Sequence, residues 1–402
     1  MKSRIFPKLM LILLTSLIGL ISSGCWGALE IEKRGYVLGI AIDKAGNEVD
    51  GKKEFEYMPL ETTGPKYAFT LDIPVISSSL NKPAGQSGGG ADRQRNWDLT
   101  VVANTFFEAN REYSTRLNYP PYYSHLKAIV ISSDVAEQDI SKLLDIFVRD
   151  PEVRRRTKVF ITPGRASDFW KVIPKIDNYP SEYLASLPNN NVKTSRMLHK
   201  TDLGKVSEAI HEHRNFVLPK VIADKYEIKD AGCAVFKNNK MVGWLDEIKT
   251  NYLKWITDYA NGGVVSVNLP GFSDSPITLE IKKVKTKQRP IPTEDSVEMV
   301  LDVKADLDVA EVSIPGDTNV FSPEFVSQLE KAAEEKIQDQ ILDTVSYVQR
   351  EYDADVFFFA TNIQRFEPNT WDKIKDSWDE KFRTVKVTAN VKVKINQLGL
   401  TK

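Results

Sequence analysis

The residues that could carry chemistry are few, because the 402-residue chain has only four histidines and two cysteines. His211 and His213 stand two positions apart in a segment with helical spacing, so their imidazoles would point to different faces and would chelate one metal ion poorly. His125 and His199 stand alone, and no nucleophile, base and acid can be assembled into a catalytic set. The sequence therefore predicts no enzyme activity, no metal site and no cofactor.

The two cysteines are predicted to have different roles. Cys233 lies in the apolar segment 231–236, which is typical of a buried small hydrophobic side chain and not of a nucleophile. Cys25 directly follows Ser22-Ser23-Gly24, and a cysteine after small residues at this point is what lipoprotein processing uses. Its thiol would take a diacylglycerol through a thioether, and cleavage would leave it as the first residue, with an N-acyl group. With Cys25 acylated, Cys233 would have no partner for a disulfide.

The segment before Cys25 has the pattern of an export signal. Lys2, Arg4 and Lys8 form a basic start, and an apolar stretch follows from Leu9 to Ile21. This stretch is shorter than the roughly 20 residues that a membrane-spanning helix needs. We therefore expect residues 1–24 to be a lipoprotein signal peptide and the mature chain to be held at a membrane by its acyl chains. A plain secretory signal with an unmodified Cys25 is the alternative.

Composition indicates an ordinary globular body. The chain is 42% hydrophobic, 27% charged and 10% aromatic, which is neither disordered nor fibrous. After residue 21 no apolar run approaches the roughly 18 residues of a membrane span, so we expect a water-soluble body. A formal net charge of −1 argues against nucleic acid as a partner.

Element patterns predict an α+β protein of several domains, in which small mixed or antiparallel sheets pack with helices. Residues 25–200 alternate strands and helices, as in an α/β unit. Residues 201–274 contain a short hairpin signal at 231–245, flanked by helices. Residues 275–402 form the third expected domain.

The C-terminal segment carries the clearest periodic pattern. A helix is expected to begin at Ser322-Pro323, because serine is a good N-cap and proline is tolerated in the first turn. Apolar residues then recur every three or four positions up to Tyr352. A strand is expected at Asp355–Phe359, and residues 385–395 alternate as a half-buried antiparallel strand would. The sequence therefore predicts a C-terminal sheet packed against one long helix.

Two basic groups are candidate partner surfaces. Lys282 and Lys285 belong to a basic run over 282–289, which could meet anionic lipid headgroups but fits a solvated strand edge better. Arg149, Arg154, Arg155 and Arg156 flank Pro151, and they fit either a partner patch or an N-terminal ion-pair network.

Several strings in order along the chain resemble the Ger(x)C-type spore germination lipoproteins, the C subunits of nutrient germinant receptors. Together they cover essentially the whole mature chain. The first two groups are Cys25-Trp26 with Glu30-Ile31 and Gly39 to Asp43, and then Ser124-His125-Leu126-Lys127. The later groups are Leu143-Leu144-Asp145 with Arg149 to Arg154, then Ala234 to Lys237 with Met241 to Leu245, and finally Pro368, Trp371, Trp378 and Phe382. The chain departs from the family pattern at Ser22, at Gly27 and at Phe357-Phe358-Phe359, which stands in place of a glycine-rich segment.

The resemblance implies a non-catalytic subunit at the extracytoplasmic face of the spore inner membrane. Its expected partners are a multi-pass A subunit and a permease-like B subunit, and its expected role is the response of the spore to nutrients. The resemblance also implies several small α+β domains, in agreement with the element patterns.

Two other classes of function were weighed. A solute-binding lipoprotein of a transporter would have two similar lobes around a cleft, and no repeat between the halves of the sequence is visible. A cell-envelope hydrolase would need a nucleophile–base pair, and none is visible either.

Overall fold

The computed structural model describes Met10 and residues 33–46, 64–75, 95–199, 201–272, 274–312 and 322–397. Cys25 and almost all of the expected signal peptide lie outside the described residues, and so does the segment 54–59, for which the sequence predicts a strand. No helix among those described is long and apolar enough to cross a membrane.

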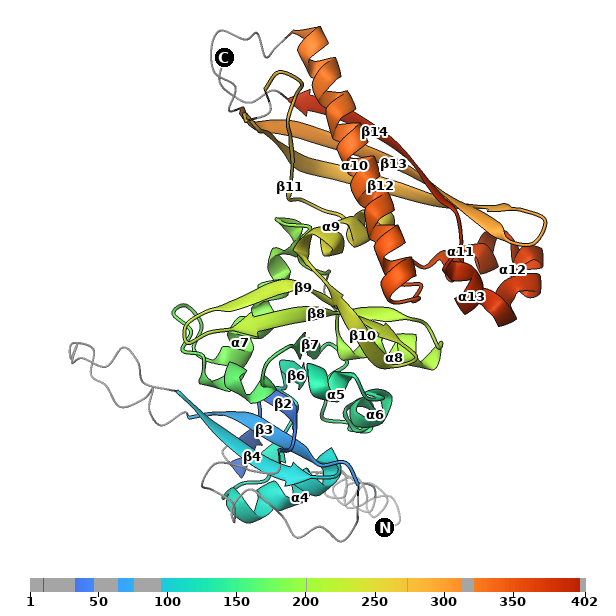
Figure 1. Cartoon of the computed structure of the whole chain (residues 1–402). Coiled ribbons are helices and arrows are strands. Elements are labelled where there is room, and N and C mark those ends of the chain that lie inside the picture. Colours follow the sequence, from blue (N-terminus) through green and yellow to red (C-terminus); the bar gives the residue numbers. More distant parts are fainter. Residues whose placement is uncertain are drawn as a thin grey trace, which may run out of the picture.

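An eight-stranded mixed sheet forms the N-terminal and central part of the molecule (Figure 1). Its strand order is β10-β9-β8-β7-β6-β2-β3-β4, in which β2, β6, β7 and β8 are parallel neighbours and both edges are antiparallel. The strands are β2 (Gly39–Lys44), β3 (Tyr67–Pro74), β4 (Asn96–Ala103), β6 (Ala128–Ser132), β7 (Lys158–Thr162), β8 (Phe216–Ala223), β9 (Ile228–Lys237) and β10 (Lys240–Leu245). A separate short parallel pair joins β1 (Gly35–Tyr36) to β5 (Pro121–Tyr122).

Helices cover both faces of this sheet. Phe106, Leu144 and Val206 belong to the apolar core on one face, and this core is covered by α4 (Phe106–Arg116), α5 (Ser133–Ala136), α6 (Ser141–Arg149) and α8 (Leu203–His211). Trp170 and Leu184 belong to the core on the other face, under the 3-10 helices η2 (Ala166–Lys171) and η3 (Leu187–Val192) and helix α7 (Pro180–Ser186). Helical crossovers between β6, β7 and β8 explain their parallel order.

The sheet runs across the position where we expected the first domain to end. β7 pairs with β8 at Ile161 and Lys220, and β8, β9 and β10 continue as an antiparallel ladder. The expected hairpin is therefore the far edge of the large sheet, and its turn uses Asn238 and Asn239 at positive φ. The domain limits at 200/201 and 274/275 stay a prediction.

The C-terminal part confirms a sheet packed against one long helix. A four-stranded sheet has the order β11-β12-β13-β14, with β11 (Val264–Val267), β12 (Ile277–Pro292), β13 (Val297–Val312) and β14 (Val387–Gln397). Helix α10 (Pro323–Glu351) buries Leu329, Ile337 and Val348 in the core. The Ser322 side chain accepts a hydrogen bond from the Phe325 N–H at 3.1 Å and caps the helix as predicted. Helix α9 (Glu247–Ile256) belongs to the same core and joins this part to β9 and β10.

Two predictions for this part were wrong. β14 pairs in parallel with β13 and not in an antiparallel ladder, because the helices between the two strands return the chain to the same end of the sheet. Residues 355–359 form no strand. The Asp355 carboxylate accepts hydrogen bonds from the N–H groups of Phe357, Phe359 and Ala360 at 3.1, 3.2 and 2.7 Å, which hold a turn that leads into α11 (Phe359–Phe366), α12 (Pro368–Ile374) and α13 (Trp378–Phe382).

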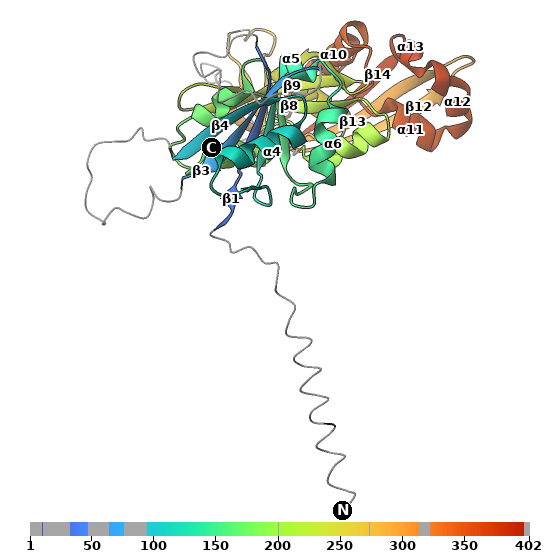
Figure 2. The same cartoon turned by 90° about the horizontal axis from the view of Figure 1, so that it is seen from below.

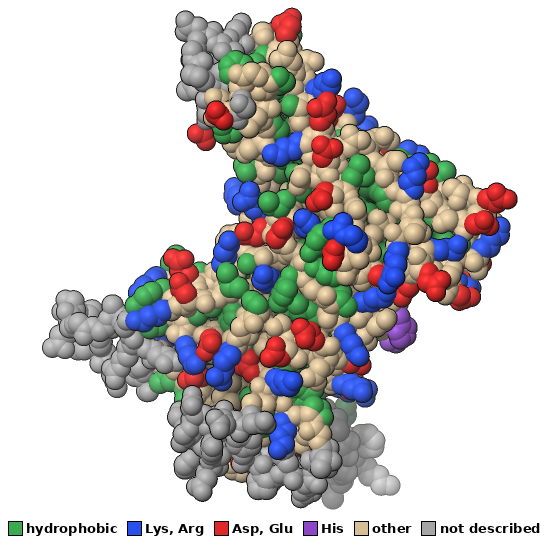
Figure 3. All heavy atoms as spheres, viewed as in Figure 1, with side chains coloured by type: hydrophobic (Ala, Val, Ile, Leu, Met, Phe, Trp, Pro, Cys, Tyr) green, Lys and Arg blue, Asp and Glu red, His purple; other side chains and the backbone are tan. Residues whose placement is uncertain are grey.

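The two sheets give the molecule an elongated shape. β3, β4 and α4 lie at one end, and β12, β13, α10 and the short helices α11 to α13 lie at the other (Figure 1). Lys and Arg side chains alternate with Asp and Glu over the face seen in Figure 3, as the near-neutral charge of the chain predicts.

Candidate functional site

The candidate residues for metal binding and catalysis lie at helix ends or are packed inside the protein. His211 ends α8, and His213 lies beyond it with φ 53°. Among the described residues no group of three His, Cys, Asp or Glu side chains could hold a metal ion. His199 stacks on Tyr259 with ring centroids 4.1 Å apart, and burial lowers its pKa to about 4. Cys233 is buried as predicted, and burial raises the pKa of its thiol to about 12.

The basic candidate residues lie in two separate places. Arg149 ends α6 and pairs with Asp145 at 2.8 Å, while Arg154 and Arg155 form no ion pair among the residues described. Lys282 and Lys285 lie on β12 in the C-terminal sheet, and they pair with Glu280 at 3.3 Å and with Asp258, respectively. The structure does not bring the two sets together.

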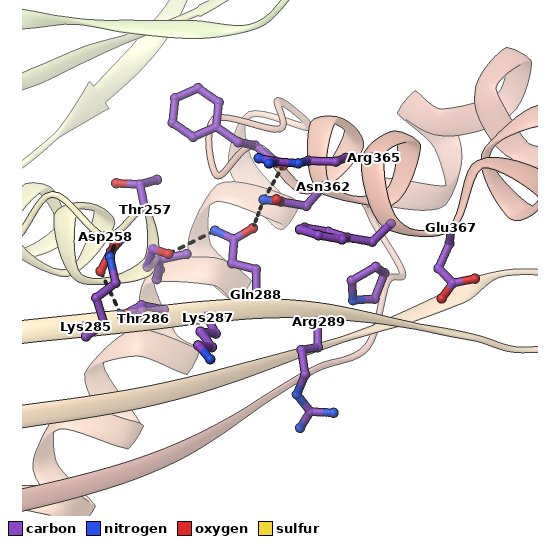
Figure 4. A pocket seen from close by; sticks show the side chains of 14 residues that line it. Thr257, Asp258, Lys285, Thr286, Lys287, Gln288, Arg289, Asn362, Arg365 and Glu367 are labelled. Atoms are coloured by element: carbon purple, nitrogen blue, oxygen red, sulfur yellow. Dashed lines mark hydrogen bonds and ion pairs between the residues drawn. The ribbon is translucent and has the colours of Figure 1, made fainter.

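A groove of about 860 Å³ runs along β12 (Figure 4). β11 pairs with β12 only from Ile277 to Glu280, so the rest of this edge of β12 has no neighbouring strand. The end of α9 and the middle and end of α11 lie beside this bare edge and form the walls of the groove. We call the hollow the β12 groove.

Gln288 fixes the floor of the β12 groove. Its Nε2 donates to the carbonyl oxygens of Ile256 and Phe357, each at 2.9 Å, and its Oε1 accepts from Asn362 Nδ2 at 2.7 Å. One side chain thus joins β12, the end of α9 and α11 (Figure 4). Since all three contacts are used internally, Gln288 holds the walls in place and is not a free ligand-binding group.

Aromatic and cationic side chains line the rest of the β12 groove. Phe366 is 54% exposed and lies beside Arg365, whose guanidinium is 5.3 Å from the centre of the ring. Lys285 and Arg289 are paired with Asp258 and Asp302, whereas Lys287 and Arg365 form no ion pair within the described part of the chain. The groove therefore suits a ligand or chain segment that carries both an apolar group and a negative charge.

Phe358 occupies a strained position at the mouth of the groove. Its φ of 64° places a bulky residue in the left-handed region, which costs on the order of 1–3 kcal/mol unless the surroundings impose it. The Asp355 hydrogen bonds impose it here, since they hold the turn on both sides of Phe358.

Sequence reasoning missed most of the β12 groove. It singled out Lys285 within the basic run, but not Gln288, Asn362 or Arg365. These residues are up to 80 positions apart, and only the packing of α11 against β12 brings them together. The one available signal was the length of the basic run, which exceeds what a short solvated edge needs.

Asp230 and Lys254 are buried ionisable residues, and Asp230 predicts a stability that decreases as the pH rises toward neutral. Asp230 on β9 is 6% exposed, and burial raises the pKa of its carboxyl to about 7. Lys254 on α9 is also buried, and its ammonium donates to the Met197 carbonyl oxygen at 2.9 Å. Burial lowers the pKa of Lys254 to about 8, while Asp230 acts to raise it.

The folded chain holds the Asp230 proton to a higher pH than the unfolded chain, in which the pKa is near 3.8. The contribution of Asp230 to the free energy of unfolding is therefore full below pH 3.8 and falls as the pH rises toward 7. Replacing Asp230 by Asn removes this loss. The difference in the free energy of unfolding between the variant and the original chain should therefore increase by about 2 kcal/mol, in favour of the variant, from pH 5 to pH 7. Urea unfolding at several pH values measures the difference. The control is Asp274→Asn at an exposed site, and a pH-independent difference for Asp230→Asn would contradict the assignment.

Comparison with known proteins places both halves of the chain in one family. Residues 27–223 match the spore germination protein N-terminal domain, and residues 231–399 match the spore germination B3/GerAC-like C-terminal domain. The chain belongs to the Ger(x)C-type spore germination proteins. The first match ends with β8 and the second begins inside β9, so the boundary between them lies within the eight-stranded sheet.

Relatives of the Ger(x)C type match over nearly their whole length. Spore germination protein YndF of Bacillus subtilis is 28% identical and covers 100% of both chains. Spore germination protein B3 of the same organism is 28% identical over 94% of each chain. A crystal structure of the GerBC protein matches with a TM-score of 0.58 and 25% identity, over 84% of this chain and 95% of that one. This likeness confirms the predicted family and the α+β fold.

Proposed function

We propose that this Ger(x)C-type protein is the lipid-anchored, non-catalytic C subunit of a spore nutrient germinant receptor. In this proposal acyl chains on Cys25 hold it on the extracytoplasmic face of the spore inner membrane. A multi-pass A subunit and a permease-like B subunit are its partners. The single observation that supports the role most strongly is the match of both halves of the chain to germination-protein domains.

In this proposal the β12 groove is the surface that contacts a partner subunit. It has a rigid floor at Gln288 and exposed groups, Phe366, Lys287 and Arg365, that an acidic and apolar segment of a partner subunit could contact. A partner contact needs position and charge but no nucleophile, and the described lining contains no His, Cys or Ser side chain.

Isolation of the native complex tests the proposed assembly. An affinity tag after residue 402 should retain the A and B subunits from detergent-extracted spore membranes, with identification by mass spectrometry. The Lys287→Glu, Arg365→Glu double variant should recover less of both, because it reverses the charge of the β12 groove. Lys331→Glu, Lys373→Glu on the exposed surface is the matched control. Recovery of no multi-pass protein with the unaltered chain would contradict the assembly.

The size of the β12 groove favours one second candidate, a solute-binding lipoprotein. Its volume of about 860 Å³ lies within the range of small-molecule sites. Under this alternative, calorimetry with amino acids and sugars should show micromolar or tighter binding that Phe358→Gly weakens. Glycine tolerates the positive φ at this position, so this variant removes the side chain without breaking the turn. Absence of heat with every solute would exclude the alternative for those solutes.

A further inference from the structure

A second, smaller hollow lies on the N-terminal part of the molecule, about 130 Å³ in volume. Five basic side chains line it: His125, Lys127, Arg154, Arg156 and Lys158. They come from the segment before β6 and from the segment that leads into β7, which are adjacent parallel strands. Arg154 and Arg156 belong to the basic group beside Pro151 that the sequence offers as a candidate partner surface, whereas His125, Lys127 and Lys158 do not.

Most of the positive charge in this hollow has no ion-pair partner among the residues that the structure describes. Lys158 has a carboxylate partner, Asp202, at 3.7 Å. Lys127, Arg154 and Arg156 are exposed and form no ion pair within the part of the chain that the structure describes. Burial and then the charges of Arg154 and Lys127 lower the pKa of His125, so the local field at this imidazole is positive. Such a field attracts an anion with several oxygens, which Arg and Lys bind through charge-assisted hydrogen bonds.

The position of the hollow points to the source of that anion. The Tyr36 ring packs edge-to-face on His125 with centroids 5.2 Å apart, and Tyr36 belongs to β1, which pairs with β5. Figure 2 shows β1 at the rim of the body, far from α11 to α13. Gly35 is ten residues after Cys25, and a chain of that length spans at most about 35 Å. An acyl anchor at Cys25 would therefore hold Gly35 within about 35 Å of the bilayer surface, so that the hollow beside β1 can reach the headgroups.

We propose that this hollow binds the phosphate group of an acidic phospholipid. The inference rests on the proposed anchor at Cys25 and deepens it, because it gives the anchored body a second contact with the membrane and so a preferred orientation. Half-exposed Tyr36 and Tyr122 beside the hollow suit the headgroup layer, where one end of the side chain is apolar and the other is wet. Each basic side chain adds to the attraction near an anionic surface, and salt weakens it.

The test uses the full lipidated chain in nanodiscs of phosphatidylcholine, with and without phosphatidylglycerol. A Ser124→Cys substitution at the wall of the hollow reports access to a water-soluble maleimide, since Cys233 is fully buried. Labelling should be several-fold slower in discs with phosphatidylglycerol. Lys127→Gln, Arg154→Gln, Arg156→Gln together should abolish the slowing, and Lys283→Gln, Lys373→Gln, Lys394→Gln should keep it, because that control removes the same charge from other exposed sites.

Each other outcome of the test overturns the proposal in a distinguishable way. Equal labelling rates in both discs, with the protein bound to both, would contradict the headgroup site and leave the anchor intact. Protection by inorganic phosphate in phosphatidylcholine discs, without protection by phosphatidylglycerol, would assign the hollow to a free anion. A protein that does not float with either disc would contradict the anchor at Cys25, and the headgroup site with it.

Discussion

Replacing Gly232 by Ala should destabilise the protein by roughly 3 kcal/mol or more. Gly232 lies in β9 with φ +108°, and a Cβ there would stand 2.2 Å from the backbone oxygen of Leu245 and 3.0 Å from the backbone carbon of Asp246. The clash involves main-chain atoms, so no rotamer change relieves it. Asp246 is the N-cap of α9, and the substitution therefore disturbs the junction between the large sheet and the C-terminal core.

Gly271→Ala is the matched control for this prediction. Gly271 also has a positive φ, +86°, but a Cβ there would meet nothing within 4 Å. It should show the backbone strain alone, on the order of 1 kcal/mol. Urea unfolding of the two variants separates the effects, and equal midpoints would show that β9 and β10 move apart more easily than the close contact implies.

Replacing Cys25 by Ala should release the mature protein from spore membranes and impair the response to nutrients. Burial of acyl chains contributes about 0.8 kcal/mol per methylene, and two chains hold where one is marginal. Fractionation of spore lysates with immunodetection measures the release, and germination is followed by the loss of optical density after nutrients are added.

Two further variants serve as controls for the Cys25→Ala experiment. Cys233→Ala changes the other cysteine, which is buried, and should leave the protein in the membrane fraction. Cys25→Ala combined with a cleavable general secretory leader in place of residues 1–24 excludes retention by an uncleaved leader. Membrane retention of this last chain together with normal germination would mean that the protein needs no lipid anchor.

The sequence was informative wherever a pattern is local. Apolar residues at helical spacing predicted α10, and Ser322 before Pro323 predicted its first turn. The alternating pattern of β14 predicted a strand with one wet face. It did not predict the parallel pairing with β13, because alternation identifies the two faces of a strand but not its neighbour or direction.

The errors and omissions concern contacts between distant residues. Val356 to Phe359 have the composition of a strand, yet the buried Asp355 carboxylate binds the N–H groups that a ladder would use. The β12 groove joins the end of α9, the middle of β12 and α11, and no spacing in the sequence links these three segments. The small basic hollow combines residues of two parallel strands, whose pairing becomes visible only in the folded chain.

We propose that acyl chains on Cys25 hold this germination protein at the spore inner membrane. The most direct measurement is the mass of the N-terminal peptide of the protein purified from spore membranes. We predict a chain that begins at Cys25 and carries the mass of a diacylglyceryl group and an N-acyl group. A chain with an unmodified cysteine, recovered from the aqueous fraction, would contradict the account.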